Sequence, residues 1–297
     1  MDFPKYNIRK FTPVQLITIP MIILVLALVS VGITWMATGM PVTPGIDFSG
    51  GIGVTIGTSD SPEEIKEYFA AYPIESIQGI DSGDGVSYLY LKFSTLDDTG
   101  YMALVSHVSD RYPDAKIDLI GESFGQTLQH QSALALLISF IGMAIVVFVI
   151  FRTFIPSLAV VISAFADIAM TAGAMNVLGI PLSLGTTAAL LMLIGYSVDS
   201  DILLTTRVLK RKGAFDEKIV GAFRTGLIMT TTTFGAIAAM GIVSYIGQIT
   251  IIWEISAVLL IGLAFDVMNT WLTNAGILKW YNTTEKGRFS SGKRGGA

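Results

Sequence analysis

The chain has 297 residues, of which 52% are hydrophobic and 14% are charged, with a formal net charge of −4 and a mean hydropathy of +0.64. This composition is too apolar for an ordinary soluble domain and indicates a protein whose solvent is the bilayer. The absence of cysteine excludes disulfides, iron–sulfur clusters and thiolate zinc sites, and the two histidines, His107 and His130, are too far apart in sequence to suggest a metal site.

Six apolar stretches are long enough to cross a membrane, because a helix rises about 1.5 Å per residue and the hydrocarbon core is about 30 Å thick. The predicted spans cover residues 16–38, 132–151, 156–178, 183–206, 225–246 and 250–278. Lys5, Arg9 and Lys10 precede the first span, which would also fit a cleaved signal peptide. Its length exceeds a normal signal core, so we expect a retained span.

The basic residues predict the orientation. Of the 19 lysines and arginines, 15 lie before the first span, in two short loops and after the last span, and four lie within residues 39–131. Short cytoplasmic loops carry an excess of Lys and Arg, so both termini are expected in the cytoplasm. The expected order is a cytoplasmic segment (1–15), a first helix (16–38), an extracytoplasmic domain (39–131), five more helices (132–278) and a cytoplasmic tail (279–297) in the plasma membrane.

Residues 39–131 carry 14 acidic and four basic residues, a formal charge of −10, which fits either a high-salt habitat or simple solubility. Their pattern changes to alternation and amphipathic stretches. Ser61-Pro-Glu-Glu is typical of a helix start, and Asp81-Ser-Gly-Asp-Gly is typical of a hairpin turn. Strands are predicted over 53–56, 74–80, 86–93 and 115–120, with helices starting at 61 and covering 99–112. This β-α-β-β-α-β order predicts a ferredoxin-like α/β domain, a fold that many unrelated functions share.

Four aspartates fall inside predicted spans: Asp167 in the third, Asp199 and Asp201 in the fourth, and Asp266 in the sixth. A charge at the bilayer centre costs at least about 2.5 kcal/mol, so such residues usually face a protein interior or a wet cavity. No Lys, Arg or His lies inside a predicted span. The acids are therefore expected to hold protons or to share a small cation. The alternative is that each one only hydrogen-bonds a neighbouring helix.

The fourth span carries two stripes with a helical spacing of about four residues. Ser197, Asp201 and Thr205 form a polar stripe, whereas Ala188, Met192, Gly195 and Asp199 form another with two small members. Asp199 and Asp201 are therefore expected to serve different neighbours.

Small and hydroxyl side chains recur in the other spans. Thr231 and Thr232 belong to a run of four threonines, which either bond to carbonyls one turn back or line a hydrated path. Glycines at 173, 185, 195 and 262 are expected to let helices approach closely. Glu254, near the outer end of the sixth span, is expected at the interface with water.

Several motifs resemble those of one known family. Residues 44–51, Pro-Gly-Ile-Asp-Phe-Ser-Gly-Gly, resemble the Gly-Ile-Asp-Phe-Thr-Gly-Gly signature of the SecF family. Residues 120–125 look like its Val-Gly-Pro-x-Val-Gly element, and residues 194–207 are similar to the fourth-span segment that ends in Asp-Arg or Glu-Arg in SecF and SecD. Residues 222–225 and the threonines after them resemble its Arg-Thr and Thr-Thr pattern. Ala166-Asp167 replaces the usual His-Asp pair, and Asp199-Ser-Asp201 is closer to SecD; both differences look archaeal.

The resemblance, over roughly residues 14–280, implies a half unit of the resistance-nodulation-division superfamily. In that family, proton flow through membrane acids is coupled to movement of outer domains that assist preprotein export. The implied partners are SecD, the SecY channel, preproteins and lipid, with no nucleic acid, no cofactor, no metal centre and no covalent catalysis. The coupling ion is H⁺ or Na⁺.

The resemblance also assigns roles to residues. Asp199 matches the proton-pathway acid most directly, and Asp201 is included as the neighbour of Asp199. Asp167 matches the third-span aspartate. Asp266, Thr231 and Thr232 complete the expected ion-coupling set. Gly45, Asp47, Gly50 and Gly51 belong to the signature and are expected to form a structural hinge, while Arg207 and Arg224 mark the cytoplasmic boundary.

Two alternative functions stay open. One is a passive subunit that stabilises SecD and SecY without ion coupling, in which case the acids are packing features. The other is a small-molecule efflux half-transporter of the same superfamily. Such pumps normally carry two large outer domains per half, and this chain has a single outer segment of about 90 residues.

Overall fold

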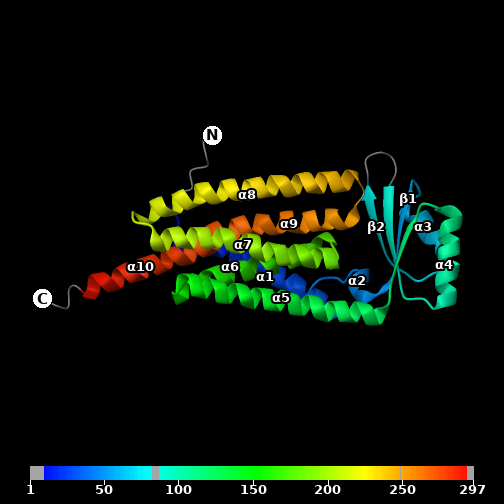
Figure 1. Cartoon of the computed structure of the whole chain (residues 1–297), viewed down its shortest axis with the longest axis horizontal. Coiled ribbons are helices and arrows are strands. Elements are labelled where there is room, and N and C mark those ends of the chain that lie inside the picture. Colours follow the sequence, from blue (N-terminus) through cyan, green and yellow to red (C-terminus); the bar gives the residue numbers. More distant parts are fainter. Residues whose placement is uncertain (1–9, 82–86, 248, 293–297) are drawn as a thin grey trace.

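Six membrane-crossing segments form a long bundle in the computed structural model, which describes residues 10–81, 87–247 and 249–292 (Figure 1). Within these residues, six helical segments are long and apolar enough to cross a membrane, which agrees with the predicted number. They are α1 (Pro13–Thr38), α5 (Glu122–Phe151), α6 (Phe154–Leu178), α7 (Leu184–Lys210), α8 (Phe215–Ile246) and a last segment made of α9 (Thr250–Met268), the π-helical turn η2 (Asn269–Asn274) and α10 (Ala275–Gly292).

Two helices begin well before their predicted spans. α5 begins at Glu122 rather than at residue 132, and α8 begins at Phe215 rather than at residue 225. Their first turns are polar, and polar residues give no hydropathy signal. Tertiary contacts hold these turns: Gln129 Nε2 donates to the Phe48 carbonyl at 2.7 Å, and Lys218 Nζ donates to the Val208 carbonyl at 2.9 Å.

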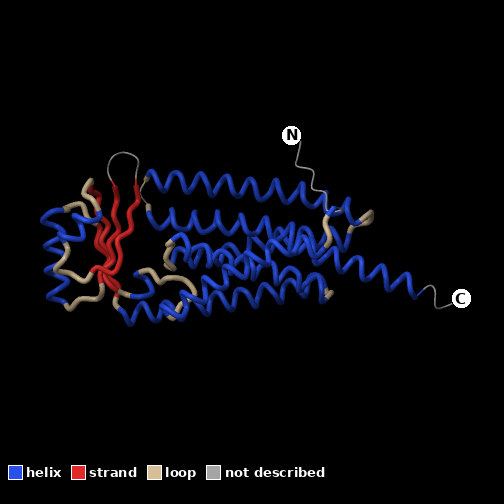
Figure 2. Tube along the Cα trace, turned by 180° about the vertical axis from the view of Figure 1, so that it is seen from behind, coloured by secondary structure: helices blue, strands red, loops and turns tan. Residues whose placement is uncertain are grey.

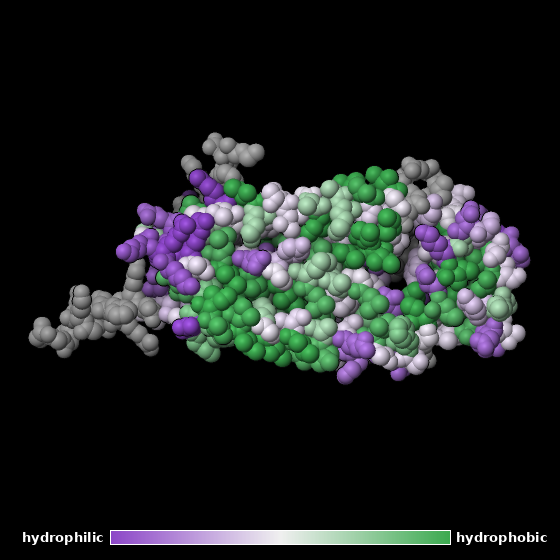
Figure 3. All heavy atoms as spheres, viewed as in Figure 1, coloured by the Kyte–Doolittle hydropathy of each residue, from purple (hydrophilic) through white to green (hydrophobic). Residues whose placement is uncertain are grey.

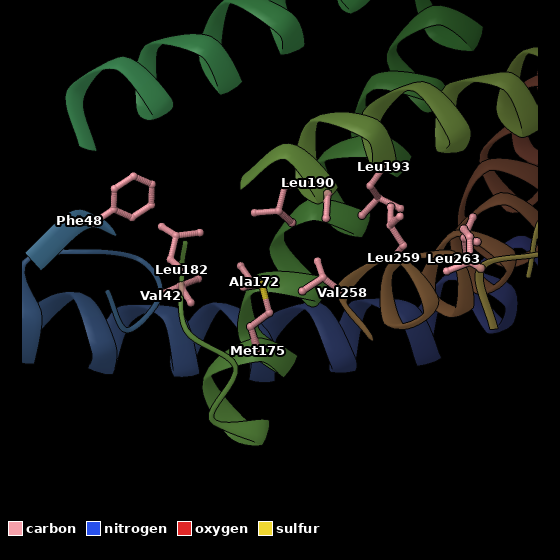
Figure 4. Close-up of a cluster of buried hydrophobic side chains, with 12 residues drawn as sticks. Val42, Phe48, Ala172, Met175, Leu182, Leu190, Leu193, Val258, Leu259 and Leu263 are labelled. Carbon is pink, nitrogen blue, oxygen red and sulfur yellow. The ribbon is translucent and has the colours of Figure 1, made fainter. Parts of the chain in front are cut away.

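The centre of the bundle is formed by α6, α7 and α9. Figure 4 shows apolar side chains from these helices meeting in one cluster: Ala172, Met175, Leu190, Leu193, Val258, Leu259 and Leu263. α1 packs on α6 at Gly173, where an added Cβ would lie 2.7 Å from the Ala27 Cα. The expectation of close helix approach at Gly173 is therefore confirmed, whereas an added Cβ at Gly195 would meet nothing within 4 Å.

The outer surface of the bundle is apolar. Large side chains such as Leu26 on α1 and Val149 on α5 are more than 60% exposed. Figure 3 shows hydrophobic residues over the middle of the visible face and hydrophilic residues gathered toward both ends. This distribution suits a protein whose middle contacts lipid.

The small domain at one end of the bundle is a four-stranded antiparallel sheet with two helices. Its elements are β1 (Gly51–Thr58), α3 (Pro62–Tyr68), β2 (Ile74–Asp81), β3 (Ser87–Phe93), α4 (Asp98–Arg111) and β4 (Lys116–Ile120). The strand order is β2-β3-β1-β4, so the predicted ferredoxin-like fold is confirmed. Ser61 caps α3 by accepting from the Glu64 N–H at 3.3 Å. Of the predicted hairpin turn, residues 81–85, Asp81 ends β2 and the other four residues lie outside the described part of the chain.

The two faces of the sheet have different neighbours. Ile52, Val54 and Ile56 alternate along β1 and are fully buried, together with Phe69 directly after α3 and Leu104 of α4. These helices cover the face that points away from the bundle, and the opposite face looks toward the ends of the long helices (Figures 1 and 2).

The pKa of Asp60, beside α4, should respond to the loss of one phenol. The Tyr112 hydroxyl donates to Asp60 Oδ2 at 2.8 Å, and this hydrogen bond is the main reason that the pKa of the Asp60 carboxyl is lowered. Thr58 and Arg111 lower the pKa further, whereas desolvation of the carboxyl raises it. We expect Tyr112→Phe to raise the pKa of Asp60 toward 3.8 in a ¹³C carboxyl NMR titration, with Tyr196→Phe on α7 as the control.

The sign of the linked stability change follows from the direction of the Asp60 shift. A lowered folded-state pKa stabilises the fold above the unfolded pKa and loses that effect as pH falls through the folded pKa. The wild-type chain should therefore lose more stability on acidification than Tyr112→Phe. Equal acid sensitivity of the two chains would contradict this account.

Candidate ion site in the helix bundle

Three acids meet at the centre of the bundle. Asp167 on α6, Asp201 on α7 and Asp266 on α9 are each at most 1% exposed. The structure therefore brings together three of the four predicted membrane acids, from three helices that are separate in sequence.

Both carboxylate oxygens of Asp167 are occupied by donors. Ser197 Oγ donates to Oδ2 and Asn269 Nδ2 donates to Oδ1, each at 2.6 Å. The first donor comes from α7 and the second from η2, so Asp167 ties three segments together. Such short contacts are typical of hydrogen bonds to carboxyl groups.

Asp201 and Asp266 share a hydroxyl donor. Thr270 Oγ1 lies 2.9 Å from Asp201 Oδ1 and 3.2 Å from Asp266 Oδ1. Asn274 Nδ2 also donates to Asp201 Oδ1 at 2.8 Å, and Ser200 Oγ lies 2.9 and 3.0 Å from the two oxygens of Asp266. A threonine hydroxyl has one hydrogen and can serve only one of the two acids at a time. Thr270 can therefore donate to Asp201 or to Asp266, but not to both at once.

The donors missed by the sequence analysis come mainly from η2. A π-helical turn is wider than an α-helical turn, and such turns are frequent at functional sites. Here it places Asn269, Thr270 and Asn274 on the face that meets the acids, all three fully buried. The available signal was the run Asn269-Thr-Trp-Leu-Thr-Asn274 inside an otherwise apolar span.

No basic side chain is among the described hydrogen-bond partners of the three acids; their donors are Ser197, Ser200, Asn269, Thr270 and Asn274. The site therefore supplies neutral donors and no permanent positive charge. Without a fixed cation beside them, the carboxyl groups are left to hold a proton or to share a small cation.

Asp199 lies outside this cluster. The buried stripe of α7 contains Ser197, Asp201 and Thr205, whereas Ala188, Met192, Gly195 and Asp199 are all exposed. Asp199 and Asp201 therefore lie on different faces of α7, as the two stripes predict. The structure does not join Asp199, the acid that the resemblance matched most directly, to the other three.

The remaining predicted residues of α7 and α8 lie at the surface or at one end of the bundle. Thr231 and Thr232 are exposed on α8, and Thr232 Oγ1 donates to the Met229 carbonyl at 2.8 Å, which is local bonding. Arg207 donates to Thr225 Oγ1 at 2.7 Å and so ties α7 to α8, and Arg224 is exposed in α8.

The signature glycines lie in the elbow segment, residues 39–51, which joins α1 to β1 and contains the short helix α2 (Ile46–Ser49). Gly45 N–H donates to the Leu182 carbonyl at 2.8 Å. Asp47 Oδ2 accepts from the Leu184 N–H, the first residue of α7, at 2.8 Å. The elbow segment is therefore bound to the start of α7.

The backbone conformation explains why the last two residues of the signature are glycines. Gly50 has φ 71° and Gly51 has φ 115°, and an added Cβ at Gly51 would lie 2.5 Å from the Phe93 carbonyl oxygen. We expect Gly51→Ala to destabilise the protein by about 1–3 kcal/mol, measured by denaturant unfolding. Gly142→Ala, where an added Cβ meets nothing within 4 Å, is the control. Equal stability of the two variants would contradict strain at residue 51.

A second contact between domain and bundle involves Tyr90. Burial, followed by the nearby carboxylates of Glu254, Asp118 and Asp47, raises the pKa of the Tyr90 hydroxyl above its ordinary value. Glu254 on α9 is partly buried and accepts from Ser183 Oγ, the N-cap of α7, at 3.3 Å. The predicted interfacial acid thus lies where sheet, α7 and α9 meet.

Comparison with known proteins identifies similar sequences and folds. The family model "Protein export membrane protein SecD/SecF, C-terminal" matches residues 101–284. The chain is 56% identical over 276 residues to "Protein-export membrane protein SecF" of Methanolacinia petrolearia, covering 93% of this chain and 96% of that protein. It is 40% identical to the protein of the same name from Haloferax volcanii, covering 94% and 96% of the two chains.

Solved structures share the fold. The crystal structure of SecDF from Thermus thermophilus, described as a translocon-associated membrane protein, has a TM-score of 0.73 at 21% identity and covers 94% of this chain. A second crystal structure of SecDF, in a super-membrane-facing form, has a TM-score of 0.59 at 19% identity and covers 98% of this chain. The chain spans 39% and 41% of the lengths of these two solved chains.

Proposed function

Because the chain belongs to the SecF family of protein-export membrane proteins, we propose that it is an auxiliary subunit of the Sec translocase that uses a proton or sodium gradient to assist preprotein export. The observation that carries the ion-coupling part is the set of three buried acids whose described partners are all neutral. We assign the chain no covalent chemistry and no cofactor besides the coupling ion.

The chain is a multi-pass membrane protein, and we place both of its ends in the cytoplasm and the sheet domain outside. The excess of basic residues in short loops and tails supports this orientation. The end of α10 and the α7–α8 turn lie at the end of the bundle opposite the sheet, which agrees with it (Figure 1).

The exposed stripe of α7 supports SecD as a partner. A carboxyl in the middle of a span is costly in lipid, and Asp199 is exposed on this chain. Gly195 on the same stripe leaves room for a close helix, because an added Cβ would meet nothing within 4 Å. We therefore assign this stripe to the SecD interface. The solved SecDF chains, more than twice as long as this one, agree with a second half.

The same helices connect the acids with the sheet domain. α7 carries Asp201 in its second half and receives Asp47 of the elbow segment at its first N–H. α9 carries Asp266 in its last turn and Glu254 in its first turns, beside Tyr90 of β3. A shift of α7 or α9 on ion binding would therefore move the attachment of the outer domain, which would act on emerging preproteins beside SecY.

The passive-subunit alternative makes the opposite prediction for the acids. If Asp167 and Asp199 only pack helices, neutral replacements that preserve assembly should preserve export. Replacing these two acids tests both a buried and an exposed carboxyl, because Asp167 is buried and Asp199 is exposed.

The test is preprotein export in cells that lack the native copy and carry Asp199→Asn or Asp167→Asn, with protein level and SecD co-purification measured. Asp110→Asn, an exposed acid on α4, is the matched control. We expect export to fall at least about tenfold, corresponding to about 1.4 kcal/mol, in both membrane variants while they assemble with SecD. Normal export in both membrane variants would contradict ion coupling through these acids and favour the passive-subunit alternative.

A further inference from the structure

Trp271 belongs to the π-helical turn η2 but lies on a different face from the donors of that turn. Asn269 and Asn274 donate to Asp167 on α6 and to Asp201 on α7. The Trp271 side chain is only 4% exposed and packs against α8 instead. This short turn therefore contacts the acids on one side and α8 on the other.

Two contacts define where the indole sits on α8. The rings of Trp271 and Phe223 meet edge to face, with centroids 5.0 Å apart and planes at 83°. At Gly226, an added Cβ would lie 2.6 Å from Cζ2 and 3.3 Å from Cη2 of Trp271. The indole therefore rests directly on the backbone of α8, and it can do so because Gly226 has no side chain.

The register of η2 decides which donors reach the acids. Hydrogen bonds in a π-helical turn join residues five apart, so Asn269 and Asn274 lie on nearly the same face. In an α-helix the same two side chains would point about 140° apart, because each residue turns that helix by about 100°. An α-helical register would therefore take one of the two amides away from the carboxyl groups.

A hydrogen bond inside the turn orients one of these amides. Thr273 Oγ1 donates to Asn269 Oδ1 at 3.0 Å, which leaves the Nδ2 group of the same amide to face Asp167. Thr273 belongs to η2 itself, so this bond cannot hold the turn in place against its neighbours. Trp271 can, because its side chain reaches a second helix.

We propose that Trp271, seated on Gly226 of α8, is a positioning residue that holds η2 in its π-helical register and so keeps Asn269 and Asn274 on the carboxyl groups. The donors described above come from α7 and η2, so the inference adds α8 to the elements that shape the acid cluster. A displacement of α8 would reach the acids through one side chain. The consequence for export rests on the proposed function.

The experiment crowds the indole and then makes room for it. Gly226→Ala places a methyl group against the six-membered ring of Trp271, to which Cζ2 and Cη2 belong. Trp271→Phe removes both of these atoms, and the double variant combines the two changes. Gly235→Ala, also on α8, is the matched control, because an added Cβ there meets nothing within 4 Å.

The side-chain amide signals of asparagine report the register of η2 in NMR spectra of the ¹⁵N-labelled full chain in detergent. We expect Gly226→Ala and Trp271→Phe each to shift the signals of Asn269 and Asn274. The signal of Asn176, which donates to the Pro41 carbonyl at 3.0 Å, should stay unchanged as an internal reference. The double variant should return both signals toward their wild-type positions, because phenylalanine leaves space for the added methyl group.

Stability and export provide the second and third measurements. Gly226→Ala should lower the Tm by about 2–10 °C through overpacking, whereas Gly235→Ala should not lower it. In cells that lack the native copy, Gly226→Ala should reduce export about tenfold, the usual effect of losing the support behind a functional group. The double variant should recover most of that loss.

Wild-type Asn269 and Asn274 signals in Gly226→Ala would overturn the inference even if the Tm fell, because the contact would then hold helices together without setting the register of η2. If Gly226→Ala does not fold, wild-type signals in Trp271→Phe would overturn it in the same way. Signals that stay displaced in the double variant would also contradict it. Displaced signals with normal export would support the positioning role and count against the proposed ion coupling, so the two failures are distinguishable.

Discussion

Asp167→Leu should destabilise the purified chain by about 2–5 kcal/mol, because it removes the acceptor of two buried donors. Ser197 Oγ and Asn269 Nδ2 both bind this carboxyl at 2.6 Å, and each buried donor left without a partner costs about 1–3 kcal/mol. Asp167→Asn has nearly the same volume and keeps one acceptor oxygen. We therefore expect it to lose less stability than Asp167→Leu.

The matched control for this prediction is Asp199→Leu on α7. Asp199 is exposed, so its replacement leaves no buried donor without an acceptor and should not destabilise the isolated chain. Denaturant unfolding in one detergent compares all three variants. If Asp167→Leu and Asp199→Leu unfold alike, the hydrogen bonds of Asp167 do not hold α6, α7 and η2 together.

Gly173→Leu should also have a large effect, a loss of about 3 kcal/mol or more, because it acts where two helix backbones touch. An added Cβ at Gly173 would lie 2.7 Å from both the Cα and the Cβ of Ala27 on α1. Neither atom can rotate away, so α1 must separate from α6. The hydrogen bond from Ser30 Oγ to the Gly173 carbonyl, at 3.3 Å, would be lost with the contact.

Gly142→Leu on α5 is the control for the glycine substitution, because an added Cβ there meets nothing within 4 Å. Thermal unfolding and limited proteolysis of both variants would show whether α1 is released. A Gly173→Leu chain with the wild-type Tm would mean that α1 contributes little to the stability of the bundle.

Local patterns were sufficient to predict the elements. Six apolar runs predicted six crossing segments, and the alternation in Ile52, Val54 and Ile56 belongs to a strand with one buried face. Ser61 caps α3 as its sequence context predicts. These features depend on neighbours within a few residues, so they can be read without the tertiary structure. The starts of α5 and α8 escaped prediction because polar first turns carry no apolar signal.

The sequence by itself determined that this is a six-span membrane protein with a ferredoxin-like domain, and that Asp199 and Asp201 lie on different stripes of one helix. Only the tertiary structure decided which stripe is buried, because both carry polar or small residues and either would fit a neighbouring helix. It also decided that Asn269, Thr270 and Asn274 join the acids, since a π-helical turn changes which residues share a face. Periodicity gives a helix its stripes, but the neighbours that pack against each stripe come from distant parts of the chain.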